Sequence, residues 1–176
     1  MKKKELIISI LLHSLFIVSV YIVQGVIFPH IRVAGFVPLL LPTASIGIAL
    51  YEGRYTGGIT GLFAGILCDV SFNQPTGVFT VLLTLTGLIV GTMSDTIVLK
   101  GFVTYYIGSA AILVISAIVQ MIPLVLSPDQ SIPVQALIST AIQQTIYSLI
   151  LAFPMWFFIR ALGKRTERVA PSGRTY

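Results

Sequence analysis

Long stretches without a charged residue divide this chain and limit what it can fold into. The first covers residues 6–31, and the others are 33–51, 55–68, 70–94, 101–128 and 130–159. A helix of about 20 apolar residues crosses the hydrocarbon core of a bilayer. Only 10% of the residues are charged, whereas soluble domains have roughly 25%. The sequence therefore predicts an all-α, polytopic membrane protein.

The short stretch 55–68 decides the number of crossings. If it dipped into the bilayer and returned, the five remaining crossings would place most Lys and Arg residues outside. If it crosses, every basic residue except Arg32 lies on one side, as expected from the excess of Lys and Arg in cytoplasmic loops. The sequence therefore predicts six spans with both termini in the cytoplasm. The cytoplasmic set is Lys2, Lys3, Lys4, Arg54, Lys100, Arg160, Lys164, Arg165, Arg168 and Arg174.

Two parts of the chain follow from this layout. Residues 1–162 form the transmembrane domain, with spans near 6–28, 36–51, 53–72, 77–95, 102–126 and 135–160. Residues 163–176 form a basic cytoplasmic tail. The net charge of +5 comes from the two ends, so we expect contact with anionic lipid and no nucleic-acid partner. The lipid-facing basic residues would be Lys2, Lys3, Lys4, Lys164, Arg165 and Arg168.

Glycines recur at every fourth position of the third span. The row is Gly53, Gly57, Gly61 and Gly65, Asp69 continues it, and Gly87 and Gly91 repeat the spacing in the fourth span. Small residues let helix backbones approach closely in lipid, where the hydrophobic effect does not drive helices together. Two alternatives are open: packing inside the chain, with Thr80, Thr84 and Gly87 as one opposing surface, or an exposed docking face for another protein.

Asp69 lies about one turn from the outer end of the third span, where a carboxylate is costly unless it is hydrated or paired. Three alternatives are open. The carboxylate is hydrated by the headgroup layer, or it accepts hydrogen bonds from the turn 71–77 or the start of the fourth helix, where the helix dipole favours an anion, or it contacts a ligand or partner. Glu52 and Arg54, which flank Gly53, are expected to be solvated.

The sequence contains no recognisable arrangement of catalytic residues. Every acidic or basic residue lies at a segment boundary or a terminus, so no deep ion pair is expected. His13 is the only deep ionisable candidate and is expected to be neutral and bonded to a neighbouring helix. Gln143 and Gln144 either hold helices together or line a pocket. No HExxH pair and no nucleophile with a base occurs.

Cys68 is the only cysteine, so neither an intrachain disulfide nor a cysteine metal cluster is expected. We therefore expect no catalytic residues, no metal and no cofactor. Two classes of protein remain: a scaffold that works by binding other membrane proteins, and a compact membrane subunit that binds a substrate.

The order of these features resembles the rod shape-determining membrane protein MreD family of bacteria. In that family a proline-containing second span leads through a glycine-rich helix to an aspartate and then to a glycine-bearing turn. The matching positions here are Pro38, Gly53, Gly57, Gly61, Gly65, Asp69 and Gly77. A weaker match is the segment 153–160, which closes the last helix before the basic tail.

This resemblance implies a non-enzymatic subunit of the bacterial cell-elongation machinery in the plasma membrane. Its implied partners are an MreC-like membrane protein and, through it, the actin-like MreB and peptidoglycan synthases; a homo-oligomer is also open. The MreD fold is similar to the six-helix S components of energy-coupling-factor transporters, so the alternative function is vitamin binding in such a transporter. S components dock through small residues on their first helix, whereas large apolar residues dominate 6–28 here, which favours MreD.

Overall fold

The computed structural model describes residues 3–28, 37–72, 77–96, 101–126 and 134–169, and this part of the chain contains helices and no strand. In chain order the elements are α1 (Lys3–Ile22), the π-helix η1 (Val23–Ile27), α2 (Leu40–Glu52), α3 (Arg54–Phe72), α4 (Val78–Thr96), α5 (Phe102–Leu126) and α6 (Val134–Val169). The prediction of an all-α protein is confirmed.

The short helix α2 forms the centre of the molecule. Every residue from Leu40 to Leu50 is buried, and α2 contacts every other α-helix. Its 13 residues extend only about 20 Å at 1.5 Å per residue, less than the roughly 30 Å hydrocarbon core of a bilayer. Apolar on all sides and enclosed on all sides, α2 is a core helix around which the other five pack.

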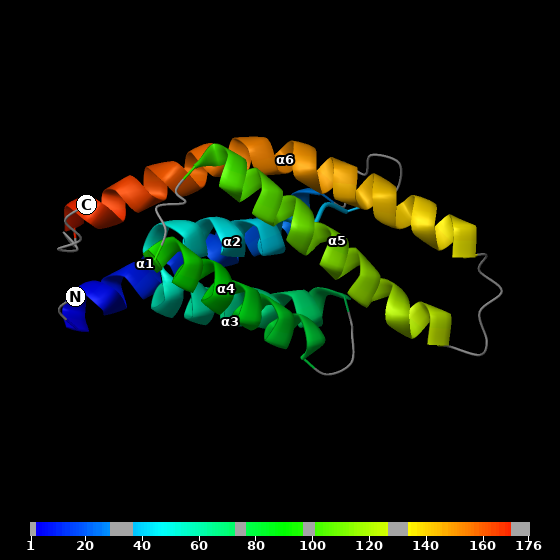
Figure 1. Cartoon of the computed structure of the whole chain (residues 1–176), viewed down its shortest axis with the longest axis horizontal. Coiled ribbons are helices and arrows are strands. Elements are labelled where there is room, and N and C mark those ends of the chain that lie inside the picture. Colours follow the sequence, from blue (N-terminus) through cyan, green and yellow to red (C-terminus); the bar gives the residue numbers. More distant parts are fainter. Residues whose placement is uncertain (1–2, 29–36, 73–76, 97–100, 127–133, 170–176) are drawn as a thin grey trace.

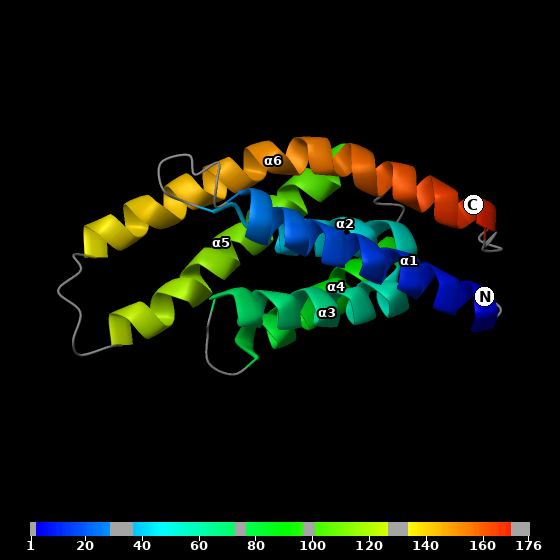
Figure 2. The same ribbon diagram turned by 180° about the vertical axis from the view of Figure 1, so that it is seen from behind.

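The helix α1 lies along one side of this core, as Figure 2 shows. Its buried stripe consists of Ser9, His13, Ile17 and Val20, and Gln24 in η1 continues it. Their spacings of three and four residues place them on one helix face, and three of the five are polar. The opposite face of α1 carries exposed large apolar side chains, as expected for contact with hydrocarbon.

The other four helices form two hairpins of different shape (Figure 1). α3 and α4 run side by side over their whole length, whereas α5 and α6 extend past the other helices at one end of the molecule. The start of α1 and the end of α6 lie together at the opposite end. α6 has 36 residues, or about 54 Å, and its helix continues through residues 163–169 of the expected tail.

By length and composition, three helices of the described part are able to cross a membrane: Ile7–Val26, Phe102–Met121 and Ile138–Gly163. Two shorter apolar helices are Leu40–Glu52 and Val78–Ser94. The glycine-bearing α3 belongs to neither set. The structure is therefore that of a helical membrane protein, and the six crossings of the sequence analysis stay a prediction.

Candidate functional site

The glycine row of α3 lies inside the bundle. A methyl group added at Gly57 would lie 2.9 Å from the Cα atom of Ala49 in α2 and 2.9 Å from the carbonyl oxygen of Gly87 in α4. A methyl group added at Gly61 would overlap the carbonyl oxygen of Leu83. Side-chain carbon atoms essentially never come this close to a backbone, so only glycine allows this separation of the helices.

The same contact continues toward both ends of the hairpin. A methyl group added at Gly65 would lie 2.7 Å from the carbonyl oxygen of Phe79, and one at Gly91 would lie 2.5 Å from the Cα atom of Arg54. All four glycines of the row are buried. These contacts match the first alternative, packing inside the chain, because a partner would reach the row only after displacing α2 or α4.

Gly53 and Gly77 serve the backbone in another way, since both have positive φ, at 82° and 76°. Gly53 joins α2 directly to α3: its N–H donates to the carbonyl of Ala49 at 3.1 Å, and its carbonyl accepts from the N–H of Gly57 at 2.9 Å. Gly77 precedes α4, and its carbonyl accepts from the N–H of Val81 at 3.0 Å. A side chain in this region of φ costs about 1–3 kcal/mol, which explains the glycines here.

The Asp69 carboxylate caps the first turn of α4. Its Oδ1 accepts from the N–H of Phe79 at 3.0 Å, and its Oδ2 accepts from the N–H of Thr80 at 3.0 Å and from the Thr80 hydroxyl at 2.5 Å. The first N–H groups of a helix have no partner within the helix, and the helix dipole favours an anion there. Of the three alternatives for Asp69, the second describes these contacts: the carboxylate fixes the end of α3 to the start of α4.

Side chains from η1 and α6 accept hydrogen bonds from the N-terminal end of α2. Gln24 Oε1 accepts from the N–H of Leu40 at 3.0 Å and from that of Leu41 at 3.3 Å, and the Ser148 hydroxyl accepts from the N–H of Leu39 at 2.8 Å. α2 lacks a side-chain cap of its own. These bonds therefore replace the missing cap and fasten two neighbouring helices to the core.

Gln144 adds a further bond at this end, because its Nε2 donates to the carbonyl of Val37 at 3.0 Å. Gln143, one residue earlier, is exposed. Gln144 therefore holds α6 to the segment that precedes α2, and Gln143 does not share this contact. Sequence reasoning missed Gln24 and Ser148, although the spacing of four residues between Gln144 and Ser148 already placed both on one face of a helix.

The prediction that Glu52 is solvated is wrong. Its side chain is only 10% exposed and lies against α1, where the Ser9 hydroxyl donates to Oε2 at 2.8 Å and His13 Nε2 lies 3.7 Å from Oε1. The sequence did not predict that Glu52 lies beside His13, because the last turn of α2 faces α1 instead of water. Arg54 is exposed as expected and donates to the Tyr55 hydroxyl at 2.8 Å.

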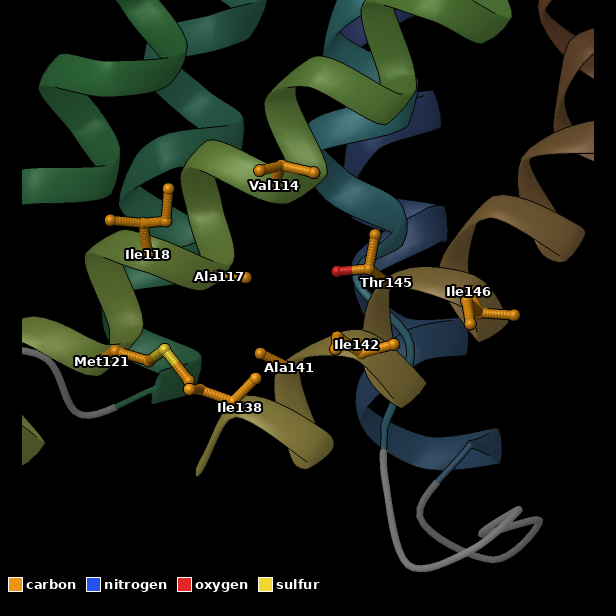
Figure 3. A pocket seen from close by; sticks show the side chains of 9 residues that line it. All are labelled: Val114, Ala117, Ile118, Met121, Ile138, Ala141, Ile142, Thr145 and Ile146. Carbon is orange, nitrogen blue, oxygen red and sulfur yellow. The ribbon is translucent and has the colours of Figure 1, made fainter. Parts of the chain in front are cut away.

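An apolar groove with a volume of about 240 Å³ lies between α5 and α6. Figure 3 shows side chains of both helices around it, with the Thr145 hydroxyl as the one polar side-chain group. Sites for small organic molecules usually add several placed polar groups to an apolar wall. This lining suits a hydrocarbon surface better. Its residues are Val114, Ala117, Ile118, Met121, Ile138, Ala141, Ile142, Thr145 and Ile146.

The predicted lipid-facing basic residues lie at the end of the molecule where α1 starts and α6 ends (Figure 1). Lys2 lies outside the described residues. Lys3 and Lys4 belong to the first turn of α1, and Lys164, Arg165 and Arg168 belong to the last turns of α6. The side chains of these five are not described, so their contact with lipid stays a prediction.

The helices, the buried polar contacts and the apolar outer faces together define an α-helical membrane protein. Among the residues that the structure describes, no group of three or more His, Cys, Asp or Glu side chains is arranged to hold a metal ion. The family described as rod shape-determining protein MreD matches residues 3–166, and the chain belongs to this family. No curated protein and no solved structure matches the chain. The resemblance drawn from the sequence is confirmed.

Proposed function

We propose that this protein is a non-enzymatic subunit of the bacterial cell-elongation machinery that binds an MreC-like membrane protein. Through that partner it would help to position the actin-like MreB and the peptidoglycan synthases. Membership of the rod shape-determining MreD family supports this proposal. The polar side chains of Gln24, Ser148 and Asp69 point the same way, because they bond to helix ends and are not gathered around a cleft.

The proposed topology has six crossings, with both termini in the cytoplasm. It is supported by the shared position of the start of α1 and the end of α6 (Figure 1), because an even number of crossings returns the chain to its starting side. The basic residues at these two ends favour the cytoplasmic side. A reporter fused after residue 176 and a second one inserted within 127–133 would test this: opposite compartments are expected.

The groove between α5 and α6 is the observation that best supports partner binding. The glycine row is used inside the chain, so a partner needs another surface. Around the groove, Ile118, Ile142 and Ile146 are each more than half exposed, and the smaller Ala117 and Ala141 lie between them. Small residues flanked by large apolar ones let a further helix approach closely. We propose that the membrane-spanning helix of the MreC-like partner lies here.

Capture of the partner tests this proposal with a matched pair of variants. Ala117→Leu adds a side chain inside the groove, whereas Ala111→Leu adds the same side chain to an exposed position of the same helix. After co-expression and purification in mild detergent, we expect the Ala117 variant to bind the partner roughly five- to 150-fold more weakly, since a blocked close contact costs about 1–3 kcal/mol. The Ala111 variant should capture as much as the unaltered chain.

Two other results would overturn the proposal. If both variants capture the MreC-like protein equally, the partner does not use this groove. If the purified protein instead carries a vitamin-like molecule and an ATPase module, the alternative function of a transporter S component is correct. Mass spectrometry of the co-purified proteins and of small molecules released on denaturation distinguishes these results.

A further inference from the structure

A buried acid–base pair joins α1 to the last turn of α2. His13 and Glu52 have side chains that are 2% and 10% exposed, and Nε2 lies 3.7 Å from Oε1. The other ring nitrogen of His13, Nδ1, lies 2.7 Å from the carbonyl oxygen of Ser9. The Ser9 hydroxyl donates to the second carboxylate oxygen, Oε2, at 2.8 Å. All polar atoms of the pair therefore face a partner inside the protein.

The positions of the hydrogen atoms follow from these partners. A carbonyl oxygen only accepts, so Nδ1 must carry a hydrogen and donate it to Ser9. The Ser9 hydroxyl hydrogen is used for Oε2. Nε2 and Oε1 then face each other, and without a further proton both would present lone pairs. Two such groups repel each other, and the repulsion is strong where water is excluded.

We propose that the His13–Glu52 pair shares one proton, carried either by Nε2 or by Oε1, which makes this pair a proton-binding site. Whether the pair is an imidazolium with a carboxylate or a neutral imidazole with a carboxylic acid, its net charge is zero, which burial favours. The C-terminal end of a helix disfavours an anion. Glu52 therefore depends on this proton and on the Ser9 hydroxyl for its place at the end of α2.

The site has a consequence for the attachment of α1. Gln24 fastens α1 to the start of α2, and the His13–Glu52 pair fastens it to the end of α2. The opposite face of α1 is exposed and apolar. Loss of the shared proton would therefore loosen the half of α1 that carries His13, while the contact of Gln24 would stay in place.

Protonation is measured directly on the folded protein in lipid bilayers at pH 7. The chain has two histidines, so a His30→Gln background leaves His13 as the only source of nitrogen NMR signals from imidazole. Infrared difference spectra between this protein and its Glu52→Gln variant report the carboxyl group. We expect one proton beyond that of Nδ1, found either on Nε2 or on Glu52. A neutral imidazole beside an ionised Glu52, or an imidazolium beside a protonated Glu52, would overturn the proposal.

A double-mutant cycle tests the coupling. The unfolding equilibrium in detergent is compared for His13→Gln, Glu52→Gln and the double variant. We expect the double variant to be destabilised roughly tenfold less than the two single effects predict together, as for groups in direct contact. Ser19→Ala, which removes an exposed hydroxyl that bonds to the carbonyl of Leu15 in α1, should combine additively with His13→Gln. Additive effects of His13 and Glu52 would contradict the shared proton, and where a single variant does not fold, the protonation measurement decides.

Discussion

The two hairpins of this protein solve the problem of helix packing in opposite ways. Between α3 and α4, glycines bring the backbones together until no space for a side chain remains, and Asp69 joins the end of one helix to the start of the other. Between the end of α5 and the start of α6, large side chains separate the two helices and leave a groove of about 240 Å³ (Figures 1 and 3).

This difference separates a part of the molecule that is closed from a part that can accept a neighbour. A backbone contact without side chains leaves no room for another protein between the two helices, whereas exposed isoleucines around small residues do. The second half of α6 is closely packed, because Trp156 is buried there. Its ring centroid lies 5.4 Å from that of Tyr51 and 5.1 Å from that of Tyr105. Within the described part of this hairpin, the groove lies between the end of α5 and the start of α6.

The largest expected effect is that of adding a side chain to the closed hairpin. Gly61→Leu would place a branched side chain on the carbonyl oxygen of Leu83. Overpacking of this kind costs about 3 kcal/mol or more, a large share of the roughly 5–15 kcal/mol that stabilises a domain. We expect no monodisperse protein by size-exclusion chromatography after extraction in mild detergent.

The matched control for Gly61 is Gly25→Leu. An added methyl group at Gly25 meets nothing within 4 Å, so this variant should be recovered like the unaltered chain. Recovery of folded Gly61→Leu with an unchanged melting temperature would show that α3 and α4 are not packed as closely as described here.

Asp69→Ala is the next largest change, because it removes the cap of α4. The carboxylate accepts three hydrogen bonds from two residues, and loss of a charged acceptor from a partly buried site costs about 1.5–3 kcal/mol. Thermal unfolding in detergent should show a clearly lower melting temperature. Asp69→Asn should lie between, because its amide oxygen accepts from one N–H while its amide nitrogen cannot accept from Thr80.

Ser71→Ala provides the comparison for Asp69. Ser71 is exposed, and its hydroxyl bonds only within α3, to the carbonyl of Leu67 at 2.8 Å. We expect a change within about 0.5 kcal/mol. Equal melting temperatures for the Ser71 and Asp69 variants would mean that the carboxylate does not hold the two helices together.

The sequence predicted the helices well because hydrophobic stretches and glycine positions mark their ends. The span predicted at 102–126 coincides with the helix α5, and the spans predicted at 53–72 and 77–95 differ from α3 and α4 by one residue at the boundaries, while the crossings themselves stay a prediction. α6 continues to Val169 because a helix can extend past the end of its apolar stretch. The buried position of α2 could not be predicted, since a helix apolar on every side looks the same whether protein or lipid surrounds it.

The candidate site was predicted less completely, and Glu52 shows why. A charged residue in a short connection looks solvated in a sequence, and only the position of α1 reveals the buried contact with Ser9 and His13. Asp69 could be foreseen as a cap, because it precedes a helix start by a short turn. The groove has no sequence signature, since Ala117 and Ala141 become neighbours only through the angle between α5 and α6.

A smaller effect is expected where the open hairpin is tied to the core. Gln144→Leu removes the hydrogen bond to the Val37 carbonyl, and such bonds are worth about 0.6 kcal/mol on average in a membrane protein. Gln143→Leu, one residue away, alters an exposed position and should leave the unfolding free energy unchanged. Equal unfolding curves for both variants would show that the Gln144 hydrogen bond does not help to hold α6.

The smallest effect on stability is expected for Ala141→Leu, which completes the comparison with Gly61→Leu. Both variants add a leucine side chain at a helix contact, but Ala141 lines the groove of about 240 Å³ between α5 and α6. The new side chain fits into this space without pressing on the backbone. The unfolding free energy should therefore change by less than about 0.5 kcal/mol. Denaturant unfolding in detergent measures this change. A loss of stability as large as that of Gly61→Leu would show that the two hairpins are equally closed.

Because the groove is filled while the fold is kept, capture of the MreC-like partner should fall in the Ala141→Leu variant. This result would separate the role of the groove in binding from any role in folding.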